Sequence, residues 1–76
     1  MTASELQDLI VSTLLREHGG LRRRWRIVVG SLRLHDLATH AHCNWSLAPS
    51  GDYRENDRVE RLLDRMRLDH PIDTPG

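Results

Sequence analysis

An apolar stripe at helical spacing lies near the N-terminal end of the chain. It consists of Leu6, Leu9, Ile10, Thr13 and Leu14. Thr2 and Glu5 have the spacing of a capping box, which satisfies free backbone N–H groups in the first turn of a helix. Gly19-Gly20 follows the stripe, and glycine is common where helices end. The pattern predicts a helix over residues 4–18.

A second stripe of the same kind lies near the C-terminal end. It consists of Val59, Leu62, Leu63 and Met66. Asp52 and Glu55 again have capping-box spacing, and Pro71 cannot continue a helix. We therefore predict a helix that ends by about Asp69. Residues 1–70 are interpreted as one domain and residues 71–76 as a short C-terminal tail.

Between the two stripes the apolar period changes from helical to alternating. Trp25, Ile27 and Val29 alternate with other residues in a β-branched and aromatic run, which is typical of a strand. Gly30-Ser31 then suits a two-residue type II′ turn. The pattern predicts a hairpin whose outer face holds Arg24, Arg26, Val28, Arg33 and His35.

A third strand is predicted over residues 40–47. Cys43, Trp45 and Leu47 point to the core in this interpretation, and the alternate residues His42, Asn44 and Ser46 point outward. The fold class is then α+β, with a helix, a three-stranded antiparallel meander and a helix (α-β-β-β-α). Both helices pack on one face of the sheet, and the other face is left open.

The charges are unevenly distributed, although 11 basic residues balance 11 acidic residues. Residues 21–51 carry five arginines against the single acid Asp36, whereas the segments on either side are acidic. A basic open sheet face is suited to an acidic protein or to nucleic acid. The predicted binding surface consists of Arg24, Arg26, Arg33, His35, His42 and Asn44.

Histidines near Cys43 raise the question of a metal site. In a strand, His40 and His42 point to one face and Cys43 to the other, so these side chains cannot all bind one ion. If a metal binds, the ligands would be His35, His40 and His42, but we favour no metal and expect no cofactor. Cys43 is the only cysteine, which excludes a disulfide within the chain.

We interpret the chain as a small non-catalytic binding or adaptor protein that uses its open sheet face or its helix pair. Its carboxylates lie beside arginines and are not paired for acid–base chemistry, so we expect no enzymatic activity. The alternative is a nucleic-acid-binding module that acts through the Arg-rich first strand, and a small metal-binding protein is third. We expect a protein partner, no membrane association and a cytoplasmic location, with homodimerisation as a further alternative.

Overall fold

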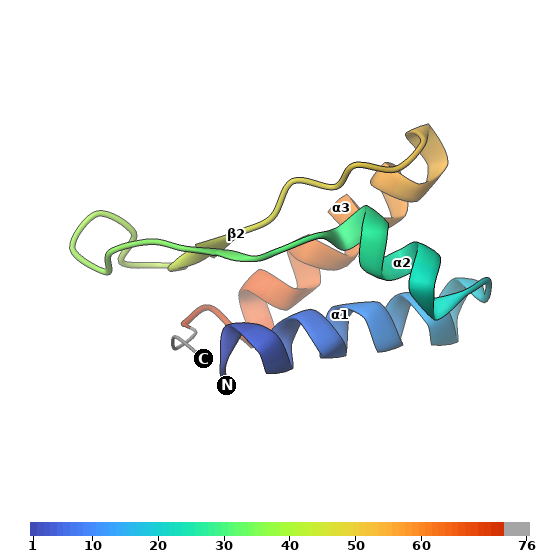
Figure 1. The fold of residues 1–76 in the computed structure, drawn as a ribbon. Helices are drawn as coiled ribbons and strands as arrows, with labels where there is room; N and C mark the ends of the chain where they lie inside the picture. Colours follow the sequence, from blue (N-terminus) through green and yellow to red (C-terminus); the bar gives the residue numbers. More distant parts are fainter. Residues whose placement is uncertain (73–76) are drawn as a thin grey trace.

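Residues 1–72 are described by the computed structural model, and they fold into three helices and a two-stranded antiparallel sheet (Figure 1). In chain order the elements are α1 (Ala3–His18), α2 (Arg22–Val29), β1 (Arg33–Leu34), β2 (Trp45–Ser46) and α3 (Tyr53–Asp69). The predicted α+β class is observed, but the three-stranded meander is not confirmed. Within residues 1–72, no helix combines the length and the apolar character that crossing a membrane requires.

The two long helices lie close to where the apolar stripes predict them. α1 follows Thr2, whose Oγ1 accepts a hydrogen bond from the Glu5 N–H at 3.1 Å. α3 follows Asp52, whose carboxylate accepts a hydrogen bond from the Glu55 N–H at 2.8 Å. Each glutamate carboxylate accepts a bond from its N-cap N–H, at 3.1 Å in α1 and 2.9 Å in α3. Both predicted capping boxes are therefore confirmed.

Residues 24–29, predicted as the first strand, lie in the helix α2 (Arg22–Val29) instead. Trp25, Val28 and Val29 are buried, and their i, i+3, i+4 spacing places them on one face of a helix. In a strand, Ile27 would share the face of Trp25 and Val29, yet Ile27 is 57% exposed. The predicted burial of Trp25 is confirmed, whereas the strand assignment that motivated it is wrong.

A glycine turn holds α2 against the end of α1. Gly19 and Gly20 have φ angles of +71° and +90°, in the left-handed region that glycine adopts without steric cost. The Trp25 indole N–H donates a hydrogen bond to the Gly19 carbonyl at 2.8 Å. Because Trp25 lies one turn into α2, this bond stabilises the chain reversal and the helix together.

Gly30 ends α2 and does not form the predicted type II′ turn. Its φ angle of +65° is also left-handed, and its N–H donates to the Arg26 carbonyl at 3.0 Å. Its own carbonyl accepts a hydrogen bond from Gln7 Nε2 on α1. A glycine with positive φ suits both a helix end and a hairpin turn, and here it ends a helix.

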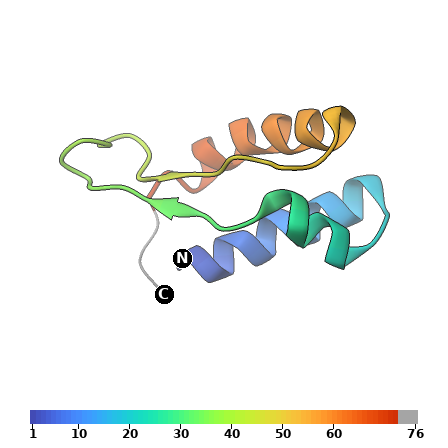
Figure 2. The same cartoon turned by 45° about the horizontal axis from the view of Figure 1, so that its top comes forward.

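The sheet consists of one short antiparallel pair, with Arg33 opposite Ser46 and Leu34 opposite Trp45. Leu34 and Trp45 pack against the core, whereas Arg33 is exposed. The inward and outward positions of this pair are therefore as predicted, although the third predicted strand is reduced to two residues. Residues 35–44 form a loop that extends away from the helices (Figures 1 and 2).

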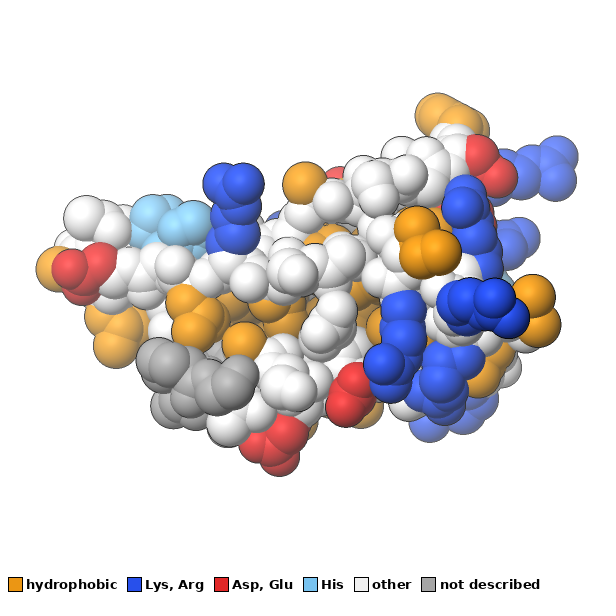
Figure 3. All heavy atoms as spheres, viewed as in Figure 1, with side chains coloured by type: hydrophobic (Ala, Val, Ile, Leu, Met, Phe, Trp, Pro, Cys, Tyr) orange, Lys and Arg blue, Asp and Glu red, His pale blue; other side chains and the backbone are white. Residues whose placement is uncertain are grey.

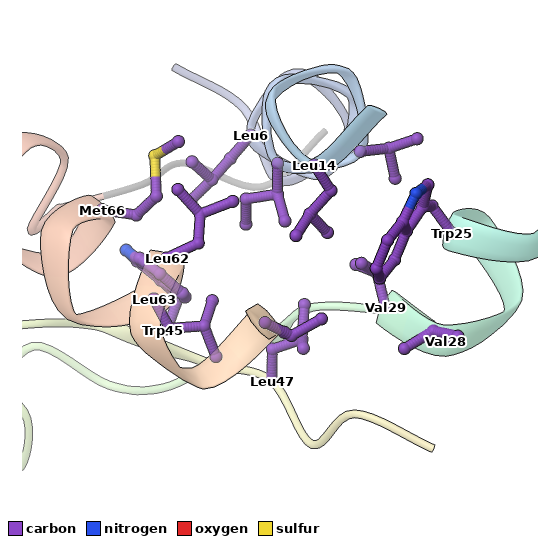
Figure 4. Close-up of a cluster of buried hydrophobic side chains, with 13 residues drawn as sticks. Leu6, Leu14, Trp25, Val28, Val29, Trp45, Leu47, Leu62, Leu63 and Met66 are labelled. Atoms are coloured by element: carbon purple, nitrogen blue, oxygen red, sulfur yellow. The ribbon is translucent and has the colours of Figure 1, made fainter. Parts of the chain in front are cut away.

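The core combines side chains from all three helices, from β2 and from the residue after β2 (Figure 4). Its buried members are Leu6, Ile10, Val11, Leu14, Trp25, Val28, Val29, Trp45, Leu47, Val59, Leu62, Leu63 and Met66. The Trp45 indole N–H donates to the His70 carbonyl at 2.7 Å, and the Asn44 N–H donates to the Pro71 carbonyl at 3.1 Å. These bonds join the segment after α3 to β2. Of the tail predicted over residues 71–76, positions 73–76 lie outside the described residues.

The segment before α3 passes very close to the end of α2. The Ser50 N–H donates to the Val28 carbonyl at 2.9 Å. A Cβ atom on Gly51 would lie 2.8 Å from Val28 Cγ2 and 2.6 Å from Glu55 Oε1, both closer than ordinary van der Waals contact. Glycine is therefore required at position 51 for this approach of the two segments.

Trp45 provides a test of this packing. We predict that Trp45→Ala lowers the free energy of unfolding by about 3–5 kcal/mol, because it leaves a cavity and removes the bond to the His70 carbonyl. Tyr53→Ala is the matched control, because Tyr53 is 87% exposed, and it should leave stability nearly unchanged. Urea unfolding followed by circular dichroism measures both. Equal stability of Trp45→Ala and the wild type would contradict the observed core.

Candidate binding surface

The outward side of α2 carries most of the arginines in the basic middle of the chain. Because Trp25, Val28 and Val29 face the core, the remaining positions of the helix face solvent. We call the exposed residues Arg22, Arg23, Arg26 and Ile27 the α2 arginine surface. Figure 3 shows arginine side chains gathered over α2 and the start of α3, at one end of the molecule, with histidine side chains toward the opposite end.

The charge of this surface is only weakly neutralised by neighbouring acids. Arg26 Nη2 lies 3.6 Å from Asp8 Oδ1, and both side chains are more than half exposed, so the pair contributes little to stability. Arg22 Nη1 donates to Ser12 Oγ at 3.2 Å, which leaves its charge in place. Among the described residues, no carboxylate lies within ion-pair distance of Arg22 or Arg23. The surface therefore keeps positive charge for an external anion.

Arg24 has a different role from its neighbours, because it is paired with Glu55 at the start of α3. Its Nε and Nη2 atoms donate to the two carboxylate oxygens of Glu55 at 2.9 and 2.7 Å. This bidentate pair, together with the Asp52 N–H, lowers the pKa of Glu55 from 4.5 to about 2. The same pair raises the pKa of Arg24. The structure thus gives Arg24 a partner within the fold.

A second polar region lies on the outward face of the sheet. Arg33 is opposite Ser46, and His35 Nε2 lies 2.7 Å from Ser46 Oγ. An open groove with a volume of about 650 Å³ adjoins them; it is lined by Ser31, Arg33, Ser46, Leu47 and Ala48. The groove and the α2 arginine surface belong to different elements.

The residues predicted to share one open sheet face are therefore divided among several places. Arg24 and Arg26 lie on α2, whereas Arg33 lies on β1 and His35 directly follows β1. His42 is exposed in the loop before β2, and Asn44 is buried at 6% exposure. Asn44 was expected outside, but its backbone bond to the segment after α3 places it inside the fold.

The predicted histidine set is not arranged as a metal site. The rings of His35 and His40 are stacked, with centroids 4.2 Å apart and an interplanar angle of 18°. A ring nitrogen binds a metal in the plane of its ring at about 2.0–2.1 Å, so two nearly parallel rings do not point at one ion. In residues 1–72, no group of three or more His, Cys, Asp or Glu side chains is placed to hold a metal.

Two features of these surfaces were missed from the sequence, namely the exposed position of Ile27 and the Ser46 contact with His35. A helical interpretation of residues 22–29 would have found the first, because it places Arg23 and Ile27 four residues apart on one face. The second depends on which residues pair across the hairpin. The sequence contains no turn signal that fixes this pairing.

Comparison with protein-family models, curated proteins and solved structures gives no match to this chain. Evidence about its function therefore comes from the arrangement of its own residues. The two regions that this arrangement provides are the α2 arginine surface and the groove beside the sheet.

The Glu55 ion pair predicts a specific dependence of stability on pH. The pKa of the Glu55 carboxyl is about 2 in the folded chain, whereas it is ordinarily 4.5, so folding favours the ionised form of Glu55. The stabilisation is complete above about pH 4.5 and is lost as the pH falls toward 2. We expect Glu55→Gln to be less stable than the wild type at pH 7 and to lose less further stability between pH 7 and pH 3.

Urea unfolding at several pH values measures this difference. Glu60→Gln is the control, because Glu60 is an exposed glutamate of α3 with no ion pair among the described residues. It should lose as much stability on acidification as the wild type does. If Glu55→Gln also declines as steeply as the wild type, the Arg24–Glu55 pair does not control this part of the pH dependence.

Proposed function

We propose that this chain is a small non-catalytic binding protein, and that its α2 arginine surface docks an acidic protein partner. The observation that carries the proposal is the orientation of α2. Its apolar face is fully used in the core, and its opposite face presents Arg22, Arg23 and Arg26 to solvent. Arginine is favoured in such interfaces because its planar guanidinium binds carboxylates through two parallel hydrogen bonds.

Apolar side chains beside the arginines favour a protein partner over a nucleic acid. Ile27 is 57% exposed, and Leu21, the N-cap of α2, is 69% exposed. Protein interfaces combine apolar contacts with arginine, whereas a phosphate backbone offers mainly charge. Asp8 beside Arg26 would also repel an extended row of phosphates. These features support a compact acidic and apolar partner surface.

Two contacts among the described residues join a hydroxyl to an imidazole, as a nucleophile and a base would be joined: Ser46 with His35 at 2.7 Å, and Thr39 with His40 at 2.9 Å. A catalytic pair of this kind needs a third group to orient the histidine. The nearest acid in sequence, Asp36, instead accepts a hydrogen bond from the Ala38 N–H at 2.9 Å. A face of the His35 imidazole stacks on the ring of His40. This supports a binding role for the hairpin residues.

The proposal is tested with the double variant Arg22→Gln/Arg23→Gln. The probes are a 15-residue synthetic peptide with glutamate and leucine on one helical face, a 20-base-pair DNA duplex and a single-stranded RNA of the same length. We expect peptide binding that weakens by about tenfold or more in the double variant, because two charge-assisted contacts are lost. Fluorescence anisotropy at two salt concentrations measures the affinities.

Two further variants separate the outcomes. Arg16→Gln/Arg61→Gln removes the same charge from exposed arginines of α1 and α3 and should bind the peptide normally. Ile27→Ser should weaken the peptide and leave any DNA binding unchanged. DNA or RNA binding that falls with salt by a slope of about −2 and is lost in the Arg22/Arg23 variant would make the nucleic-acid alternative correct. Failure of the peptide to bind at millimolar concentration would overturn the proposal.

A further inference from the structure

The groove beside the sheet combines charged, hydroxyl-bearing and apolar residues in its lining. Its volume of about 650 Å³ lies within the range of pockets that hold small ligands. Arg33 and Ser46 occupy opposite positions of the strand pair, and both line the groove. Leu47 and Ala48 also line the groove, and Leu47 belongs to the hydrophobic core. The lining thus brings a guanidinium and hydroxyl groups close to apolar side chains.

Arg33 is available to an external anion. It is exposed, and among residues 1–72 it forms no ion pair and no side-chain hydrogen bond. The hairpin pairing nevertheless fixes its backbone, because β1 and β2 are joined at this residue. An arginine held at its backbone and free at its guanidinium can meet an oxyanion with two parallel N–H donors.

Ser46 is held in a defined position by His35. The 2.7 Å contact between Ser46 Oγ and His35 Nε2 orients the hydroxyl, and stacking on His40 holds the imidazole in turn. When His35 donates this hydrogen bond, the Ser46 proton is free to point into the groove. Ser31 provides a second hydroxyl on the groove lining.

We propose that this groove binds a small organic oxyanion, with its carboxylate or phosphate group on Arg33 and Ser46. The apolar part of the molecule lies against Leu47 and Ala48. The site is independent of the α2 arginine surface, because none of its lining residues belongs to α2. It would give the binding protein a ligand of its own beside its protein partner.

The test is a titration of the whole 76-residue chain, followed by amide chemical shifts in ¹H–¹⁵N spectra. The probes are benzoate and phenyl phosphate, with acetate and inorganic phosphate as their counterparts without an apolar ring. We expect shifts at Ser31, Arg33 and Ser46, and tighter binding of the aromatic probes than of their counterparts. The stronger member of the benzoate and phenyl phosphate pair identifies the anion class.

Variants connect the shifts to the proposed contacts. Arg33→Gln should weaken binding by about tenfold or more, since the charge-assisted hydrogen bonds are lost. Ser46→Ala should weaken it less, and Arg16→Gln, an exposed arginine on α1, should not change it. Absence of shifts at the groove at millimolar probe, or affinity unchanged in Arg33→Gln, would overturn the site. Shifts confined to Arg22, Arg23 and Arg26 would do the same, because they would show anion binding on α2 instead.

Discussion

One carboxylate connects the parts of this molecule that lie far apart in sequence. Glu55 completes the capping box that starts α3, and it also receives both guanidinium donors of Arg24 on α2. Directly before the N-cap residue of α3, Gly51 lies so close to Val28 that no side chain fits between the segments. The chain returning from the hairpin is thus fixed to α2 at the point where α3 begins.

This junction also determines what α2 can present to a partner. With Trp25, Val28 and Val29 in the core and Arg24 occupied by Glu55, the helix cannot rotate without exposing apolar surface. The remaining arginines are therefore held outward on a fixed backbone. A preorganised helix face loses less conformational entropy on binding than a flexible basic segment would. This supports its use as a docking surface. The groove beside Arg33 gains rigidity in the same way from the paired strands and from Leu47 in the core.

The sequence predicts the two long helices well, because capping boxes and long apolar stripes are strong local signals. It predicts residues 24–29 wrongly, because their apolar residues fit two patterns. Trp25, Val28 and Val29 have helical spacing, whereas Trp25, Ile27 and Val29 alternate as in a strand. The choice is made by contacts that the local pattern does not contain, namely the bond from Trp25 to Gly19 and the bond from Ser50 to Val28. The first contact depends on the chain reversal at Gly19-Gly20, and the second on the return of the chain from β2 to the end of α2.

The candidate surface was predicted only in part for the same reason. The alternation around β1 and β2 correctly places Leu34 and Trp45 inside and Arg33 outside, since one apolar face must be buried. Arg24 and Arg26 were assigned to the same sheet face as Arg33, and this grouping depended on the strand that is a helix. Asn44 was placed outside because no sequence signal indicates that the segment after α3 returns to cover it.

The central claim is that residues 22–29 are helical and thereby turn their arginines outward. Backbone chemical shifts of the labelled protein test it most directly. We expect helical ¹³Cα shifts throughout Arg22–Val29 and a nuclear Overhauser contact between the Trp25 indole proton and Gly19. Strand-type ¹³Cα shifts over these residues, with cross-strand contacts between Val29 and Leu32, would contradict it.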